Sequence, residues 1–130
     1  MISRRFLLGA SAALATGFIS APALAFDVLP YDKATADKLI ASGKPVVLHV
    51  YASWCLQCHM QKSILESIQG DKTYDKITFF RVDYDGQKDI VKALDCPRST
   101  LVVYKGGKEI NRMSWGVTKE SVVNSVNTAL

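Results

Sequence analysis

The chain has 130 residues, of which 48% are hydrophobic and 22% charged, with eight Gly and four Pro. This composition is that of one soluble globular domain and excludes a disordered, collagen-like or multidomain protein. The 16 Lys and Arg exceed the 12 Asp and Glu by four charges, and the three Cys are too few for a disulfide scaffold but enough for one reactive pair and one further thiol.

Residues 1–25 have the features of an export signal. Arg4 and Arg5 precede an apolar run from Leu7 to Ile19 that Gly, Ser and Thr interrupt, and Ala23-Leu24-Ala25 has the A-x-A pattern of a cleavage site. A membrane span needs about 20 strongly apolar residues, and this run is shorter. We therefore expect a signal peptide rather than a permanent membrane helix.

The start of the chain also bears on the export pathway. Residues Ser3 to Leu8 resemble the twin-arginine signal, in which two Arg are followed by any residue and two apolar ones, although a general secretory signal also tolerates two Arg. Cleavage after Ala25 would leave residues 26–130 as a periplasmic domain with a charge of +2. Its lysines are spread singly among acidic residues, so we expect no nucleic-acid partner.

Downstream of the signal, the hydrophobic period alternates between helical and strand-like. Pro45 forces extension before the continuous apolar run Val46 to Ala52, which suits a strand buried on both faces. Strands flanked by helices and closing on a hairpin predict a layered α/β sandwich. In chain order, we expect a helix that contains Ala36, Leu39 and Ile40, a strand over 46–52 and a helix over 55–69. A strand over 77–82, a short helix over 89–94 and a strand over 101–104 follow, and a Gly106-Gly107 hairpin leads into a strand over 109–113 and a last helix capped by Thr118. The helix over 55–69 is expected to face the core with a stripe of Leu56, Met60, Ile64, Leu65 and Ile68.

Cys55 and Cys58 stand where the buried strand gives way to the helix over 55–69. Residues i and i+3 share a helix face with Cα atoms about 5 Å apart, within the range that a disulfide requires. Because a helix N-terminus favours a thiolate, Cys55 in the first turn is expected to be the exposed nucleophile. Cys58, one turn deeper and beneath Met60, is expected to be the less exposed, resolving thiol. The alternative is a static structural disulfide, although a four-residue loop constrains the unfolded chain little.

The block Trp54-Cys55-x-x-Cys58 after a buried strand resembles the thioredoxin family, and the likeness covers nearly all of residues 27–130. Supporting matches are Asp83 at the end of the third strand, the strand Thr100 to Tyr104, the hairpin at Gly106-Gly107, and Gly116 before the last helix. The resemblance implies a thioredoxin-like three-layer sandwich, with a central mixed β-sheet flanked by helices. It also implies dithiol–disulfide exchange through a redox-active Cys55–Cys58 disulfide, without an organic cofactor.

The resemblance also bears on partners. It implies protein or small-thiol disulfide substrates and a membrane redox partner that recharges the pair, while the mature protein is expected to be a soluble monomer. We expect reduction of the substrate rather than oxidation. However, Leu56-Gln57 replaces the Gly-Pro common between thioredoxin cysteines, and this dipeptide tunes the potential.

The substrate groove departs from the family pattern. A cis-Pro usually precedes the Thr that starts the fourth strand, whereas this chain has Ser99 before Thr100 and its nearest proline, Pro97, two residues earlier. A cis bond before Ser would cost about 2.5 to 4 kcal/mol, so either the peptide is trans or the loop is strained for function. Trp54, Arg98, Ser99 and Thr100 are the candidate groove residues, with core packing as the alternative for Trp54.

Two further departures lie beneath the pair. His49 falls where many thioredoxins place a buried Asp that helps to move the proton of the resolving thiol. A neutral imidazole can serve as that proton acceptor, or His49 can be a hydrogen-bonded core residue. Ser63 stands where the helix of the family often carries a kinking Pro.

Cys96 is the remaining thiol. An unpaired Cys in an exported protein suggests mixed disulfides or regulation, whereas a partly buried Cys96 would be inert.

Two other chemistries could use the cysteine pair. Cys55 to His59 also fits the C-x-x-C-H haem attachment motif, but Met113 could be a distal ligand only if it left its strand. Copper or zinc handling would use the thiols of Cys55 and Cys58 with His59 or Cys96, yet no closed metal site is predicted.

Overall fold

The computed structural model describes residues 13, 16–17 and 23–130. Most of the export signal expected over residues 1–25 therefore lies outside the described residues. Within the described part, no helix is both long and apolar enough to cross a membrane.

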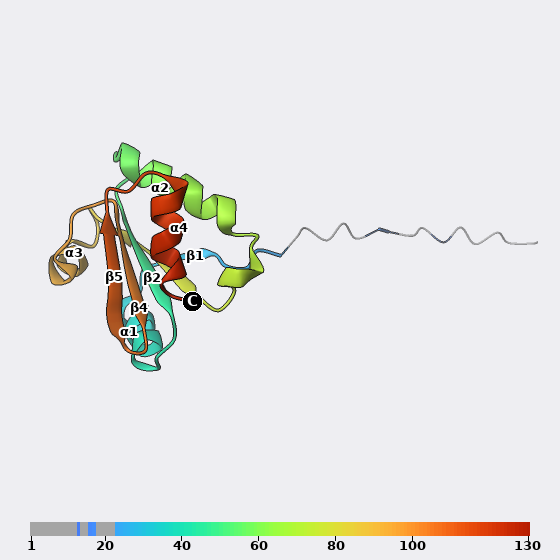
Figure 1. The fold of residues 1–130 in the computed structure, drawn as a ribbon, viewed down its shortest axis with the longest axis horizontal. Helices are drawn as coiled ribbons and strands as arrows, with labels where there is room; N and C mark the ends of the chain where they lie inside the picture. The colour runs from blue at the N-terminus through green and yellow to red at the C-terminus, as the bar shows by residue number, and fades with distance from the viewer. Residues whose placement is uncertain (1–12, 14–15, 18–22) are drawn as a thin grey trace, which may run out of the picture.

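A five-stranded mixed sheet forms the centre of the fold, as the sequence predicts (Figure 1). Its strand order is β1-β3-β2-β4-β5, in which β3 pairs in parallel with β1 and β2, and β4 pairs in antiparallel fashion with β2 and β5. The strands are β1 (Val28–Pro30), β2 (Val46–Tyr51), β3 (Thr78–Asp83), β4 (Thr100–Lys105) and β5 (Lys108–Ser114).

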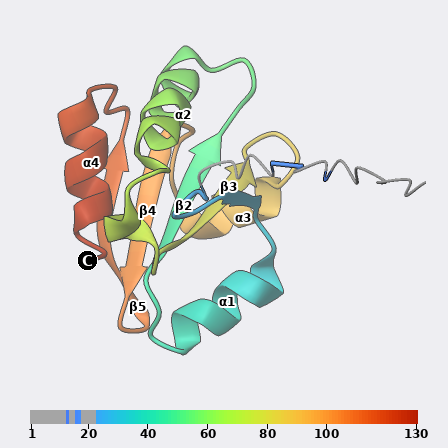
Figure 2. The same cartoon turned by 90° about the vertical axis from the view of Figure 1, so that its right-hand side faces the viewer.

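Helices cover both faces of this sheet, which confirms the three-layer sandwich (Figures 1 and 2). One face packs against α2 and α4, and the other packs against α1 and α3. The helices are α1 (Lys33–Ala41), α2 (Leu56–Ile68), α3 (Lys88–Leu94) and α4 (Lys119–Asn127), with a single 3₁₀ turn, η1 (Lys72–Tyr74), before β3.

Local sequence signals explain where several elements begin and end. Thr118 caps α4 as predicted, because its Oγ1 accepts a hydrogen bond from Ser121 N at 3.1 Å. Gly106 and Gly107 both adopt positive φ, 64° and 86°, which the two-residue hairpin between β4 and β5 requires. Strand β1 was not predicted, because this three-residue edge strand ends in Pro30 and is too short to show a period.

The central strand β2 carries the cysteine pair at its end. Its first five residues are buried, as the continuous apolar run predicts. Val47 faces the core beneath α2 and α4, whereas Val46, Leu48 and Val50 face α1 and α3. Burial on both sides fixes the end of β2, and with it the start of α2.

The buried face of α2 differs from the predicted stripe. Leu56 is 70% exposed and Met60 is 41% exposed, while Gln61 is completely buried. A residue two positions from Cys58 lies about 200° around the helix axis, so Leu56 and Met60 point away once Cys58 faces the sheet. Leu65 and Ile68 of the predicted stripe are buried, together with Cys58 and Gln61.

Candidate active site

Cys55 and Cys58 form a disulfide at the start of α2, and their Cα atoms are 5.2 Å apart. Cys55 is the N-cap of the helix, one residue before the first turn where the sequence placed it, and its Sγ accepts a hydrogen bond from Cys58 N at 3.2 Å. Cys55 N in turn donates to Ala52 O at 3.1 Å, which fixes the turn after β2. The sulfur of Cys55 therefore lies at the positive end of the helix dipole.

Both cysteines are buried in this oxidised form. Cys55 is 2% exposed and Cys58 is not exposed at all, and Ala52 with parts of Tyr51 and Tyr84 packs against them. Cys58 is the less exposed of the two, as predicted, but the prediction that Cys55 is exposed was wrong. As N-cap, Cys55 directs its sulfur back over its own helix toward Cys58 N, and this direction keeps the sulfur from solvent.

His49 lies on β2 and is completely buried. Burial, with a smaller contribution from the charge of Arg81, lowers the pKa of His49 from 6.5 to about 3, although the hydrogen bond to Gln61 opposes the shift. The Nε2 atom lies 2.9 Å from Gln61 Oε1, which can only accept, so Nε2 carries the single ring proton. The Nδ1 atom is then unprotonated and carries a lone pair, which has no hydrogen-bond partner among the described residues.

Gln61 connects this histidine to the loops around the disulfide. Its Nε2 donates to Ser99 O at 3.1 Å and to Gly116 O at 2.9 Å. The residue was missed by the sequence analysis, although a glutamine three positions after Cys58, inside the buried face of a helix, is itself a signal. A buried amide must use its hydrogen bonds, so its partners mark a built polar centre.

Ser99 adopts the conformation that the sequence analysis left open. No peptide bond between the described residues is cis, and Ser99 has a φ of 61°. Its N donates to Val50 O at 2.9 Å, and its O accepts from Trp115 N at 2.8 Å. The loop is therefore trans and left-handed at a buried serine, a strained geometry that the two backbone hydrogen bonds and Gln61 maintain.

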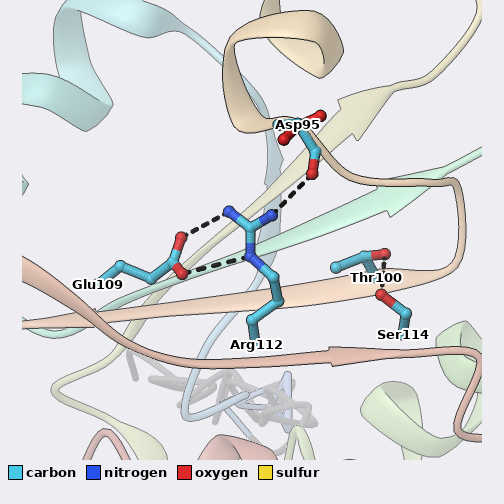
Figure 3. A network of polar contacts seen from close by, with 5 residues as sticks. All are labelled: Asp95, Thr100, Glu109, Arg112 and Ser114. Atoms are coloured by element: carbon cyan, nitrogen blue, oxygen red, sulfur yellow. Dashed lines mark hydrogen bonds and ion pairs between the residues drawn. The ribbon is translucent and has the colours of Figure 1, made fainter.

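Thr100 is turned inward and does not line the surface of the groove. It is completely buried, and its Oγ1 donates to Pro97 O at 2.9 Å and lies 2.8 Å from Ser114 Oγ (Figure 3). Arg112 donates from Nη1 to Asp95 O at 3.0 Å and binds both carboxylate oxygens of Glu109, as the same figure shows. These contacts fasten the loop over 95–99 to β5.

Trp54 and Arg98 form the surface beside the pair. Trp54 is 59% exposed, and its Nε1 donates to Asp85 Oδ2 at 2.7 Å, so the core-packing alternative does not describe it. The Arg98 guanidinium lies over the Trp54 ring and also over Trp115, a residue that sequence reasoning missed because 61 positions separate it from Trp54.

Cys96 lies in the same loop, beside a cleft of about 580 Å³ that Tyr84, Lys88 and Lys92 also line. Burial raises the pKa of its thiol above the ordinary value, and the nearby charge of Arg112 only partly offsets this. Neutral pH therefore leaves less of Cys96 as thiolate than of a free cysteine.

The residues that the metal and haem alternatives need are engaged elsewhere. His59 Nε2 lies 2.6 Å from Ser53 O, and the Sδ of Met113, within β5, accepts from Gly116 N at 3.2 Å. Among residues 13, 16–17 and 23–130, no group of three or more His, Cys, Asp or Glu side chains is arranged to hold a metal ion.

Comparison with known proteins agrees with this site. The Thioredoxin family model matches residues 27–128. Thioredoxin-2 of Saccharomyces cerevisiae is 37% identical over 79 residues, which cover 59% of this chain and 74% of the yeast protein. Thioredoxin of Mycolicibacterium smegmatis is 26% identical over 102 residues, covering 76% of this chain and 90% of that protein.

A solved structure shows the same fold. The crystal structure of Trxlp from Edwardsiella tarda superimposes with a TM-score of 0.71 at 29% identity, covering 75% of this chain and 96% of that one. A mixed sheet with a close cysteine pair at the start of a covering helix defines a dithiol–disulfide exchange protein. The chain belongs to the thioredoxin family and is a thiol–disulfide oxidoreductase.

Proposed function

We propose that the chain is an exported thioredoxin that reduces disulfides in the bacterial periplasm, with Cys55 attacking and Cys58 resolving. The observation that carries the proposal is the hydrogen bond of 3.2 Å from Cys58 N to Cys55 Sγ at the N-cap of α2. A backbone N–H and the helix dipole directed at this sulfur stabilise its thiolate. Cys58 is the less exposed of the two cysteines, so the substrate is expected to meet Cys55 first.

The exchange proceeds in two balanced steps. The thiolate of Cys55 attacks one sulfur of the substrate disulfide, whose S–S bond breaks, and the released thiolate takes up a proton. Cys58 then loses its proton and attacks Cys55 Sγ, which forms the Cys55–Cys58 disulfide and frees the second substrate thiol. Two electrons and two protons pass to the substrate, and a dithiol carrier in the membrane returns them to the pair.

His49 is the candidate proton acceptor for the resolving step. His49 is hydrogen-bonded to Gln61, which lies on the same buried face of α2 as Cys58, and its Nδ1 lone pair has no partner among the described residues. A proton that leaves Cys58 can then pass to a base of low affinity, which would release it rather than keep it. Loss of the pH dependence of the resolving step in His49→Gln would support this role, and an unchanged pH profile would leave His49 as a core residue.

The proposal of export is supported by the signal-like pattern of residues 1–25 and by the family match, which begins at residue 27 just after the A-x-A pattern. The full chain expressed in a bacterium is expected in the periplasm with Phe26 as its first residue. Replacing Arg4 and Arg5 together by Lys separates the pathways, because retention in the cytoplasm identifies the twin-arginine route. An uncleaved wild-type chain in the cytoplasm would contradict export.

Disulfide exchange is tested with the reduced protein and an insulin disulfide as substrate. Cys55→Ser is expected to abolish reduction, and Cys58→Ser to stop after the first attack with a mixed disulfide between Cys55 and substrate. Cys96→Ser is the matched control and is expected to keep wild-type turnover. Wild-type turnover in Cys55→Ser, or no trapped mixed disulfide in Cys58→Ser, would overturn the assignment.

A further inference from the structure

The Arg98 side chain is held between two indole rings next to the disulfide. Its guanidinium carbon lies 4.6 Å from the centre of the Trp54 ring and 4.9 Å from that of Trp115. Trp54 directly precedes Cys55, and Ser99 after Arg98 donates to Val50 O, the carbonyl 3.9 Å from Cys58 Sγ. The arginine is therefore at the rim of the cysteine pair.

Contacts other than those with Arg98 position both tryptophans, through the ring of Trp54 and through the backbone of Trp115. Trp54 donates from Nε1 to Asp85 Oδ2 at 2.7 Å and meets the edge of Tyr84 with ring centres 6.3 Å apart. Trp115 donates its backbone N–H to Ser99 O at 2.8 Å and has a φ of 68°. The two indoles thus form a slot that orients the guanidinium before any ligand arrives.

The hydrogen-bonding capacity of Arg98 is unused. Within the described part of the chain it makes no salt bridge, and its buried Nε has no hydrogen-bond partner. Two indole rings lie against the guanidinium, and its N–H groups point outward along the edge of its own plane. A planar oxyanion with two acceptors matches that edge, and a carboxylate is the one that peptides and small thiols carry.

We propose that Arg98, clamped by Trp54 and Trp115, binds a carboxylate of the disulfide substrate and so selects substrates with an acidic group close to the reactive sulfur. This inference rests on the proposed exchange at Cys55. Arg98 takes no part in the transfer of electrons or protons. The carboxylate can come from an acidic side chain beside the cysteine of a protein or from the terminal carboxylate of a small thiol.

The test compares three small symmetric disulfides that differ in charge: dithiodipropionate, bis(2-hydroxyethyl) disulfide and cystamine. Arg98→Met is expected to slow the reaction of the reduced protein with dithiodipropionate about tenfold, the loss of one charge-assisted contact. The rate with the neutral disulfide should stay within about twofold, and the rate with cationic cystamine should rise, because a like charge is removed. Equal slowing with all three would overturn the proposal.

Two variants control for folding and for long-range charge. Arg98→Lys keeps the charge but not the planar fork, so it should recover less than half of the lost rate with dithiodipropionate. Lys92→Met removes one positive charge from the neighbouring cleft without touching either indole, and should leave the preference intact. A loss of preference in Lys92→Met equal to that in Arg98→Met would overturn the proposal. A wild-type protein that reduces none of the disulfides would instead contradict the proposed function itself.

Two further substrates distinguish the sources of the carboxylate. One is glutathione disulfide, and the other is a pair of peptide disulfides that differ only in Glu or Gln beside the cysteine. If Arg98→Met slows reduction of the Glu peptide but not of the Gln peptide, the slot binds an acidic side chain of a protein segment. If it slows reduction of glutathione disulfide, the slot binds the carboxylate of a small thiol. If it affects neither, the proposal is overturned.

Discussion

His49 Nε2 lies 2.9 Å from Gln61 Oε1, and this contact joins the central strand to the helix that carries the cysteines. Through the nitrogen of the same amide, Nε2, Gln61 also donates to the carbonyls of Ser99 and Gly116. One buried hydrogen-bond network therefore links four separate segments around the active disulfide. Because the network is buried, protonating His49 or removing one of its hydrogen bonds lowers the stability of the folded protein.

The first prediction concerns acid stability. The pKa of His49 is about 3 in the folded protein and ordinarily 6.5, so between these values the unfolded chain binds a proton that the native state does not. Stability is then complete above pH 6.5 and falls as the pH drops toward 3, by about 1.4 kcal/mol per pH unit. Urea unfolding at several pH values measures this slope.

His49→Gln should remove this slope, because glutamine does not titrate and its amide can still donate to Gln61. The matched control is His59→Gln, which replaces the exposed histidine and should retain the wild-type slope. A slope in His49→Gln equal to that of the wild type would show that another group causes the acid sensitivity.

The second prediction concerns Gln61 itself. Gln61→Met keeps the length of the side chain but removes three hydrogen bonds and leaves buried partners unpaired, so it should lower the free energy of unfolding by about 2 to 4 kcal/mol. Gln69→Met, at the partly exposed end of the same helix, should change it by less than about 0.5 kcal/mol. Similar small losses in both variants would contradict a structural role for the network.

The third prediction concerns the loop before β4. Ser99→Pro restores the residue that the family usually has there, but a proline has φ near −65° and no N–H, whereas Ser99 has φ 61° and donates to Val50 O. We expect a loss of stability of about 3 kcal/mol or more. Ser99→Gly, which accepts positive φ without strain, should stay within about 1 kcal/mol of the wild type. A proline variant as stable as the wild type would contradict the described loop.

Much of the fold could be predicted from the sequence, because the sequence signals for its elements are local. The buried run of β2, the Gly106-Gly107 hairpin and the Thr118 cap each depend on a few adjacent residues. The face of α2 was predicted correctly at Leu65 and Ile68 but wrongly at Leu56 and Met60. The sequence shows that the helix is amphipathic only on average, while the position of Cys58 decides which side meets the sheet.

The site could be predicted from the sequence only in part. Cys55 and Cys58 are recognisable because their chemistry depends on spacing along one helix. Arg98 and Trp115 come together through the conformation of a loop and the pairing of β4 with β5, which the spacing of residues does not encode. The same is true of the partners of Gln61, which lie 38 and 55 positions further along the chain.

The fourth prediction concerns Cys96. Because burial raises the pKa of its thiol, alkylation by iodoacetamide at neutral pH should be several-fold slower in the folded protein than in the urea-unfolded chain. The experiment uses the oxidised protein, in which Cys55 and Cys58 are bonded, so that mass spectrometry reports Cys96 alone. Equal or faster alkylation in the folded state would favour a reactive role in mixed disulfides.

The most direct measurement of the reductive exchange proposed for this thioredoxin is the equilibrium of the Cys55–Cys58 pair with glutathione. The protein is equilibrated at a series of ratios of reduced to oxidised glutathione, and the fraction of reduced pair is read by thiol alkylation, with Cys96→Ser to remove the third thiol. We predict a potential close to the thioredoxin value of about −270 mV. A potential near the oxidising extreme of about −120 mV would contradict reduction of substrates.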